Sequence, residues 1–352
     1  MVSVVICTYK RPGVVHILLK SIENQSKLPE NIIIVGTSEI DFNTDTNNQI
    51  IKLRNKGIKV EKFCAPKGLT KQRNFGVNQL PTDTTIVCFL DDDILIPKNY
   101  FESVSNNFRD LPDAIGIGFV THDNLNRKNR ISIWDSISMN NSFRPGKLLK
   151  SGINSGFDYQ SKPYLVDWLP GCSMSYKYNI FQNVNFDERR SDVGWGEDVD
   201  FSFRTKEFGN LYMVSISDLV HTRSKVNRDG VQRIIELDYL SKVYFALDKI
   251  GPVKFSWIIF SIFFNFKFKL FRFNFKFKLF RFIDFISRVR SKTKGRENMD
   301  IIKILTLCIQ IYNGIFRKFN SDIFNLMTHI KTRLTLIMYV YRIKKELSEK
   351  YE

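Results

Sequence analysis

Apolar positions in the first 90 residues alternate between two spacings along the chain. Short, nearly continuous β-branched runs predict buried strands, and runs with apolar residues three or four positions apart predict helices. The predicted strands cover residues 2–7, 32–35, 59–64 and 85–90, and the predicted helices cover residues 14–23, 50–56 and 71–80. Strands that alternate with helices in this way indicate an α/β domain with a largely parallel sheet.

The pattern becomes less regular after residue 90. Two extended pieces are predicted at 115–121 and 164–168, and the stretch from about 115 to 175 is rich in Gly, Ser and Asn. A helix is predicted from Val199 to Phe208, after a turn that contains Trp195 and the acidic pair Glu197-Asp198. We therefore expect one α/β domain that extends to about residue 240, so the domain organisation is 1–240 followed by 241–352.

The region 241–352 differs in composition from the rest of the chain. It carries 23 Lys and Arg against 8 Asp and Glu, which is fifteen of the seventeen net positive charges of the chain. Residues 265–273 (NFKFKLFRF) recur unchanged as residues 274–282, so aromatic and basic side chains alternate over both copies. The pattern is that of a basic, aromatic-rich and mainly helical extension, or of an interfacial amphipathic segment in either conformation.

Overall composition bounds the class of protein. Hydrophobic residues make up 43% and charged residues 25% of the 352, which is typical of a folded protein and argues against global disorder. The five cysteines are widely spaced without a CxxC pair, which argues against a zinc site or a disulfide framework. The N-terminal run lacks the charged region, apolar stretch and cleavage site typical of a secretion signal, and the apolar stretches beyond residue 240 are interrupted well before about 18 residues, so we expect neither a signal peptide nor a transmembrane helix. We expect a cytoplasmic protein, peripheral at the inner face of the cell membrane.

Three consecutive carboxylates follow the predicted strand 85–90. Asp91, Asp92 and Asp93 repel one another unless a cation compensates, and Mg²⁺ or Mn²⁺ prefers such oxygen ligands. The alternative is a solvated acidic turn, but ligands of parallel sheets bind at the carboxyl ends of the strands. Position therefore favours a divalent-metal site.

The other candidate groups are weaker when each is taken alone. One carboxylate of Glu197 and Asp198 is placed to deprotonate a hydroxyl, although an acidic pair at a helix start is more often a decoration of the helix dipole. His221 is either a metal ligand or a satisfied core histidine. Four basic residues are candidates for phosphate contacts or are solvated surface: Arg11, Lys71, Arg73 and Arg223.

Five segments together resemble the inverting family 2 glycosyltransferases with the GT-A fold, a Rossmann-like fold with a mostly parallel central sheet. They are VSVVICTYKRP, GLTKQRNFGV, CFLDDDILIP, LPGCSMSYK and GWGEDVDFSFR, in this order, and the match covers roughly residues 1–225. Any one segment is a weak signal, but five in order are specific. The resemblance implies an enzyme of the hexosyltransferase type (EC 2.4) that uses a nucleotide-sugar donor.

The resemblance also implies roles for individual residues. Thr8, Tyr9 and Arg11 would lie around the nucleotide, with Arg73 near the base or diphosphate and Asp91 and Asp92 on the donor side. Asp93 and His221 would hold Mn²⁺ or Mg²⁺. Asp198 would be the general base, with Glu197 orienting the acceptor. The acceptor side would be formed by Trp195 and by residues 169–172, including Gly171 and Cys172.

One departure concerns the nucleobase. Many family members have an Asp in a VDDGS-like segment after the second strand, whereas this chain has Val35-Gly36-Thr37-Ser38 and no carboxylate until Glu39. UDP is the default donor nucleotide, with dTDP and GDP as alternatives. The expected acceptor is a glycan or a lipid-linked molecule in cell-surface polysaccharide biosynthesis.

Two rival hypotheses come from other classes. The basic aromatic repeat is also typical of single-stranded nucleic-acid binding, but that function leaves both acidic motifs unused. An inactive scaffold that keeps the fold is disfavoured by the intact DDD and ED motifs. Partners are therefore expected to be a nucleotide-sugar, a glycan or lipid-linked acceptor and an anionic membrane surface, with nucleic acid disfavoured.

Overall fold

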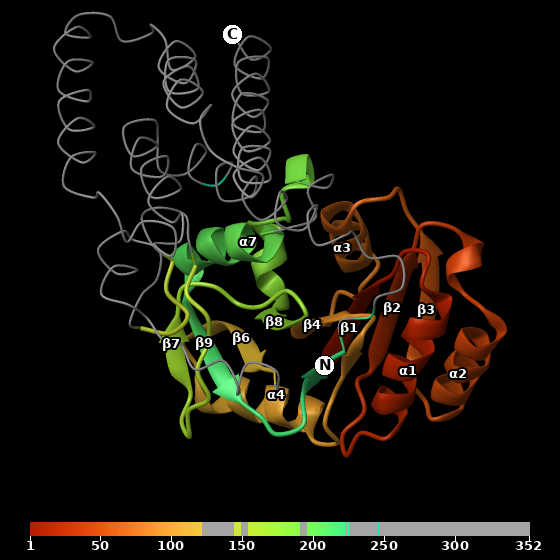
Figure 1. Ribbon diagram of the computed structural model, residues 1–352, viewed down its shortest axis with the longest axis horizontal. Coiled ribbons are helices and arrows are strands. Elements are labelled where there is room, and N and C mark those ends of the chain that lie inside the picture. The colour runs from red at the N-terminus through yellow and green to blue at the C-terminus, as the bar shows by residue number, and fades with distance from the viewer. Residues whose placement is uncertain (122–143, 149–153, 191–195, 223, 225–244, 246–352) are drawn as a thin grey trace, which may run out of the picture. The chain divides into compact units, whose positions relative to one another are not determined.

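The computed structural model describes residues 1–121, 144–148, 154–190, 196–222, 224 and 245 (Figure 1). These residues belong to one compact unit, Met1–Phe255. The extension 241–352 lies outside the described residues apart from Phe245, so its predicted helical character stays a prediction.

A sheet of eight strands forms the centre of this unit. Its order is β3-β2-β1-β4-β8-β6-β9-β7. The strands are β1 (Val2–Cys7), β2 (Asn31–Gly36), β3 (Lys59–Cys64), β4 (Ile86–Asp91), β6 (Ala114–Val120), β7 (Tyr164–Val166), β8 (Ser173–Lys177) and β9 (Asn210–Ser215). β3, β2, β1 and β4 are parallel to one another, β6 is parallel to β9, and β8 and β7 run antiparallel to their neighbours. The predicted α/β class with a mostly parallel sheet is confirmed.

Helices cover both faces of the sheet, as Figure 1 shows. They are α1 (Pro12–Glu23), α2 (Thr44–Asn55), α3 (Leu69–Asn78), α4 (Tyr100–Asp110) and α7 (Glu197–Thr205), with short 3-10 turns η1 (Glu39–Asp41), η2 (Tyr178–Gln182), η3 (Glu188–Arg190) and η4 (Lys206–Phe208). α1, α2 and α4 pack in one apolar core and α3 and α7 in another. Successive residues of β1 alternate between these cores, Val4 and Ile6 in the first and Val5 in the second.

The strand order creates a switch point between β1 and β4. The chain proceeds outward from β1 to β2 and β3, and then returns through α3 to place β4 on the other side of β1. Connections that depart in opposite directions leave a crevice beyond the carboxyl ends of the two strands, where ligands of open α/β sheets bind. Thr8 and Asp91 are located at these two ends.

The predicted elements of the first 90 residues match the structure closely, and most differences lie at helix ends. The helix predicted at 50–56 begins at Thr44, because Asn43 accepts a hydrogen bond from the Thr46 N–H and caps a polar first turn without apolar periodicity. The helix predicted at 199–208 is α-helical over Glu197–Thr205 and continues as the 3-10 turn η4. α4, β8 and β9 were not predicted.

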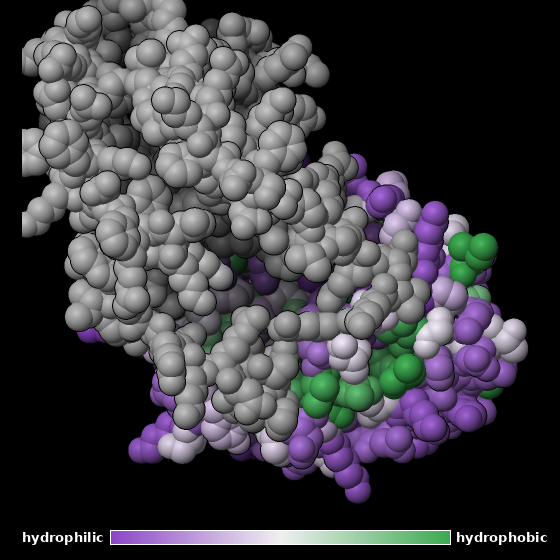
Figure 2. Space-filling model, in the orientation of Figure 1, coloured by the Kyte–Doolittle hydropathy of each residue, from purple (hydrophilic) through white to green (hydrophobic). Residues whose placement is uncertain are grey.

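Two further features concern the length of the helices and the polarity of the surface. Within the described ranges, no helix combines the length and the apolar character needed to cross a lipid bilayer. Figure 2 shows that the described part of the visible face is mostly hydrophilic, with small apolar areas.

The close packing of α3 on the sheet predicts a different effect for two glycine substitutions. A Cβ at Gly76 would lie 2.6 Å from Val5 Cγ1 and 3.2 Å from Val35 Cγ2, whereas a Cβ at Gly13 in α1 meets no atom within 4 Å. Gly76→Ala should lower the free energy of unfolding by about 1–3 kcal/mol because it overpacks the α3–β1 contact. Gly13→Ala should raise it by roughly 0.5–1 kcal/mol.

Chemical denaturation of the whole chain measures both changes. Equal effects of the two substitutions would contradict the tight contact between α3 and β1.

Candidate active site

Residues from the ends of β1 and β4 meet in the switch-point crevice. Thr8 Oγ1 donates a hydrogen bond to Asp92 Oδ2 (2.8 Å), and Arg11 Nη2 lies 2.9 Å from Asp92 Oδ1. Gln72 of α3 donates from Nε2 to the carbonyls of Thr8 (3.0 Å) and Val35 (2.9 Å), so it fixes the ends of β1 and β2 together. The candidate nucleotide residues therefore lie on a rigid edge of the sheet.

Asp92 is a buried carboxyl group that is paired with the Arg11 guanidinium. It is 1% exposed, and burial raises its pKa to about 7, although the Arg11 guanidinium and the Thr8 hydroxyl act in the opposite direction. Its contacts are with Thr8 and Arg11, and it lies outside the cluster of candidate metal ligands. Asp92 therefore organises the loop after β1.

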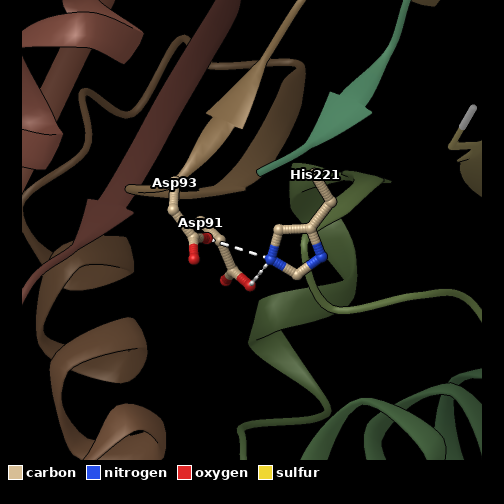
Figure 3. A group of neighbouring side chains, drawn as sticks. All are labelled: Asp91, Asp93 and His221. Carbon is tan, nitrogen blue, oxygen red and sulfur yellow. Dashed lines mark hydrogen bonds and ion pairs between the residues drawn. The ribbon is translucent and has the colours of Figure 1, made fainter. Parts of the chain in front are cut away.

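Asp91, Asp93 and His221 form a cluster of possible metal ligands. Each offers one ligand atom, and these atoms lie within 4.8 Å of one another. His221 Nε2 is 2.9 Å from Asp93 Oδ1 and 3.9 Å from Asp91 Oδ2, and Figure 3 shows the three side chains converging from the end of β4, the turn that follows it and β10. Two carboxylates and one imidazole suit Mn²⁺, and they suit Mg²⁺ less well because of the nitrogen ligand.

A short antiparallel pair of strands brings His221 to this position. β5 (Ile94–Leu95) pairs with β10 (Val220–His221), so that His221 lies opposite Ile94. The Asp93 carbonyl accepts hydrogen bonds from the N–H (2.9 Å) and the hydroxyl (2.8 Å) of Thr222, and Asp93 Oδ2 accepts from the Ser224 N–H (3.0 Å). The histidine and the aspartate, far apart in sequence, are thereby held in register.

The protonation state of His221 follows from these neighbours. Burial of the ring lowers its pKa, but hydrogen bonds with Asp93 and Cys172 and the charge of Asp91 outweigh burial and raise the pKa to about 10. The histidine is thus an imidazolium at neutral pH when no metal is bound. A metal ion bound to its nitrogen must displace that proton.

The second acidic motif begins α7. Glu197 and Asp198 are its first two residues, where the positive end of the helix dipole favours negative charge. Asp198 is partly buried, and its two carboxylate oxygens accept hydrogen bonds from the N–H groups of Gly171 (2.9 Å) and Val199 (2.8 Å). Two backbone donors, one from the turn before β8 and one from α7 itself, therefore fix the orientation of this carboxylate.

Burial perturbs the pKa values of both groups. Desolvation raises the pKa of Glu197 to about 7, the charge of Asp198 adds to the effect, and the Arg73 guanidinium opposes it. Desolvation also raises the pKa of Asp198, although the hydrogen bond from Gly171 and the charge of Arg73 oppose the rise. A carboxylate with a raised pKa is a stronger base, which suits the role predicted for Asp198.

Arg73 connects the two acidic motifs. Its Nη1 donates to Glu197 Oε1 (2.9 Å), and its Nη2 donates to the Gly171 carbonyl (2.9 Å) and lies 3.5 Å from Asp91 Oδ1. Two carboxylates more than one hundred residues apart, Asp91 and Glu197, are thus within reach of one guanidinium. The structure therefore brings the DDD and ED motifs into one site.

Some of the remaining candidate residues lie among the described residues, and others lie outside them. Tyr9 lies at the edge of the crevice, with Lys67 Nζ 4.6 Å and Lys10 Nζ 5.4 Å from its ring centroid. The Cys172 carbonyl accepts from the Asp91 N–H (3.2 Å), and its thiol lies beside His221. Lys71 lies on α3 and is partly exposed. Trp195 and Arg223 lie outside the described residues, so their roles stay predictions.

The segment after β2 lacks the carboxylate of the VDDGS-like motif but contains two other acidic residues, Glu39 and Asp41. Glu39 pairs with Lys62 (2.9 Å), and its side chain is 74% exposed. Asp41 is fully buried and accepts hydrogen bonds from the N–H groups of Lys10 and Thr37, both 2.6 Å, as well as from the Thr37 hydroxyl and the Ser38 N–H. Asp41 thus joins the loops after β1 and β2 and is saturated with donors.

Asp41 and Gln72 were missed in the sequence analysis. Asp41 has a local signal, because the segment from Ser38 to Asp41 forms a capping box. Gln72 has none, since its partners are carbonyl groups 37 and 64 positions away.

These observations define the class of protein. An α/β domain with a mostly parallel sheet carries a carboxylate and histidine cluster at the switch point, next to an oriented, partly buried carboxylate at a helix start. This architecture matches the GT-A fold that the sequence predicts, with both acidic motifs in one crevice.

Comparison with known families identifies the domain. The family model described as Glycosyl transferase family 2 matches residues 3–168. The match covers 166 of the 352 residues, so this segment carries the sequence pattern of glycosyl transferase family 2. No curated protein is significantly similar to the chain in sequence.

Solved structures that are similar to the chain are distant in sequence. TarS of S. aureus is 16% identical over 77% of this chain and 44% of its own, with a TM-score of 0.45. A 1–349 form of TarS, solved with UDP-GlcNAc, is 14% identical over 74% of this chain and 79% of its own, with a TM-score of 0.42. The mannosyltransferase PcManGT from Pyrobaculum calidifontis, solved with GDP-Man and Mn²⁺, is 12% identical over 96% of this chain and 86% of its own, with a TM-score of 0.48. This chain thus spans less than half of full TarS, and the identification rests on the family match.

The protonated state of His221 predicts how Mn²⁺ binding depends on pH. Because the metal displaces a proton whose pKa is about 10, the apparent affinity for Mn²⁺ should rise between pH 6 and pH 8 by up to about tenfold per pH unit. His221→Ala should bind Mn²⁺ more weakly and with a smaller pH dependence.

Electron paramagnetic resonance of free Mn²⁺ measures this affinity without any turnover. His16→Ala is the matched control, because His16 lies on α1 and bonds only to the Gly13 carbonyl among the contacts described. An Mn²⁺ affinity of the parent protein that does not change with pH would contradict the predicted exchange of proton for metal.

Proposed function

We propose that this protein is a metal-dependent, inverting hexosyltransferase. It moves a sugar from a nucleotide-diphosphate sugar to a hydroxyl group of a glycan or lipid-linked acceptor in cell-surface polysaccharide biosynthesis. The observation that carries the proposal is the convergence of the Asp91, Asp93 and His221 cluster with Asp198 around Arg73. One part of this site suits a diphosphate, and the other suits a hydroxyl group that must lose its proton.

The divalent cation fits the residues present. Asp91, Asp93 and His221 would hold it, and the imidazole favours Mn²⁺ over Mg²⁺. When bound, it supplies positive charge beside the diphosphate on which negative charge grows as the sugar departs. Arg11, which is paired with Asp92 and Asp93, adds a second positive group on the same side.

Asp198 performs the proton transfer in this proposal. Its carboxylate takes the proton of the acceptor hydroxyl as the oxygen forms a bond to the anomeric carbon and the bond from that carbon to the diphosphate oxygen breaks. The hydrogen bonds from Gly171 and Val199 hold the carboxylate in one orientation before the acceptor arrives. A single displacement from the face opposite the leaving group inverts the anomeric configuration.

The donor nucleotide is proposed to be UDP, with dTDP and GDP as the alternatives. Glu39 is paired with Lys62 and its side chain is 74% exposed, whereas Asp41 is buried and saturated by four donors, so Asp41 is not presented to a base. Recognition of the base in this chain therefore depends on groups other than the carboxylate of the VDDGS-like segment.

Nucleotide release from a panel of UDP-, dTDP- and GDP-sugars with Mn²⁺ tests this function. Asp93→Ala should abolish metal-dependent release, and Asp198→Asn should lower transfer by about 10²–10⁴-fold, the usual contribution of a positioned base. Asp110→Ala, which removes a carboxylate that is 63% exposed at the end of α4, should leave release unchanged.

Proton NMR of the product then reports the anomeric configuration. Retention of the donor configuration would contradict the single displacement. No release from any donor, even with a membrane extract as the source of acceptor, would favour an inactive scaffold instead.

We also propose that the extension 241–352 associates with an anionic membrane surface. Support comes from its sequence alone, in which Phe alternates with Lys and Arg over two identical nine-residue copies. Deletion of residues 274–282 removes three basic side chains, and at roughly 1 kcal/mol each this should weaken binding to anionic vesicles by about 100-fold.

Co-sedimentation with phosphatidylserine-containing vesicles measures the effect, and vesicles of phosphatidylcholine alone are the control. A parallel salt series with single-stranded DNA decides between the two classes of partner. Tight DNA binding without vesicle binding would overturn membrane association.

A further inference from the structure

The Arg73 side chain is almost completely enclosed by protein groups. It is 2% exposed, and its guanidinium lies 5.3 Å from the ring centroid of Phe186 and 5.9 Å from that of Phe89. Its nitrogens face Glu197 Oε1, the Gly171 carbonyl and Asp91 Oδ1. Little of the guanidinium is left to contact a nucleotide.

The Gly171 peptide is bound on both of its sides. Its carbonyl accepts from Arg73 Nη2 (2.9 Å), and its N–H donates to Asp198 Oδ2 (2.9 Å). A Cβ at this position would lie 3.2 Å from each of Arg73 Nη2, Asp198 Cβ and Glu197 Oε1. Glycine at position 171 therefore permits the close approach of these three groups.

A closed circuit of contacts results. Arg73 binds Glu197, Glu197 precedes Asp198 in the first turn of α7, Asp198 accepts from Gly171, and Gly171 in turn accepts from Arg73. The same guanidinium lies 3.5 Å from Asp91, a member of the metal cluster. One buried side chain on α3 thus connects the metal cluster with the carboxylate proposed as the base.

We propose that Arg73 and Glu197 are positioning residues that set the place of Asp198 relative to the metal cluster, through the Gly171 peptide. This inference rests on the proposed function. Arg73 then contributes little to donor binding, and Glu197 contributes little to direct contact with the acceptor. Both act by holding Gly171 and the start of α7 in the geometry in which Asp198 reaches a hydroxyl group.

The geometry requires an arginine. Separate nitrogens of a planar guanidinium reach Glu197 and the Gly171 carbonyl at the same time, whereas a lysine ammonium is a single point charge on a flexible chain. Arg73→Lys therefore keeps the charge that compensates Glu197 but loses one of the two fixed contacts. Displacement of a catalytic group by about 1 Å can slow its reaction by about 100-fold.

Steady-state kinetics and donor binding of Arg73→Lys, Glu197→Gln and the double variant test the proposal. Arg73→Lys should lower kcat by about 100-fold while the donor dissociation constant, measured by calorimetry with Mn²⁺, changes by less than about threefold. Glu197→Gln should lower kcat less, because its amide oxygen still accepts from Arg73. Arg204→Lys is the matched control, since it alters an arginine–carboxylate pair with Asp200 on the same helix and should leave kcat unchanged.

The kcat of the double variant shows whether Arg73 and Glu197 act as one unit or independently. If they act as one unit, the double variant should be no slower than Arg73→Lys alone. Additive losses, or a large rise in the donor dissociation constant for Arg73→Lys with kcat unchanged, would overturn the proposal in favour of direct substrate contacts.

The parent protein is measured first, so that failure of the proposed function can be distinguished from failure of the positioning role. A parent that binds and turns over no nucleotide-sugar overturns the proposed function and this role with it, whereas an active parent with an equally active Arg73→Lys variant overturns only the positioning role. Retained donor binding in the variants shows that they are folded. If Arg73→Lys does not fold, Glu197→Gln alone decides the positioning role. A lowered kcat with unchanged donor binding supports the role, and an unchanged kcat overturns it.

Discussion

The balance of charge at one edge of the sheet constrains the rest of this structure. Five carboxyl groups converge there, from the DDD and ED motifs, and Asp92, Asp93 and Glu197 are buried. Buried carboxylates without compensation cost several kcal/mol each, so they ionise only when cations or donors face them. Arg11, Arg73 and a protonated His221 are the cations that the described residues provide. A divalent ion would replace the proton on His221 and leave the two arginines in place.

Arg11 and Arg73 have different roles because they differ in position and in exposure. Arg11 follows β1 and is 22% exposed along its side chain, so it is open to the crevice while it neutralises Asp92. Arg73 is enclosed on α3 and compensates Glu197 instead. One arginine is therefore available to a diphosphate, whereas the other is committed to the architecture of the site. Both the proposed chemistry and the positioning role of Arg73 depend on this difference in burial.

Much of the fold was predictable from local patterns. β1, β3, α1 and the start of β4 lie within a residue or two of the predicted bounds, because strand and helix periodicities are strong in this half of the chain. α4 was missed, although its apolar residues Tyr100, Phe101, Val104 and Phe108 have helical spacing. β8 and β9 were missed for another reason, since their pairing partners are distant in sequence and their patterns are short. Trp195 and the extension 241–352 lie outside the described residues, so those predictions stand as they were.

The sequence by itself determined the chemical inventory: an acidic triplet after a buried strand, an acidic pair at a helix start, a histidine after an apolar run, and five ordered segments typical of one family. These features are local, so spacing and residue type reveal them. Only the tertiary structure decided which groups meet. The β5–β10 pair brings His221 to Asp93, Gln72 joins the ends of two strands, and Arg73 turns away from solvent toward Glu197 and Gly171. Each of these contacts joins residues 37 to 128 positions apart, and no local pattern records a partner at such a distance, because the packing of helices on the sheet selects it.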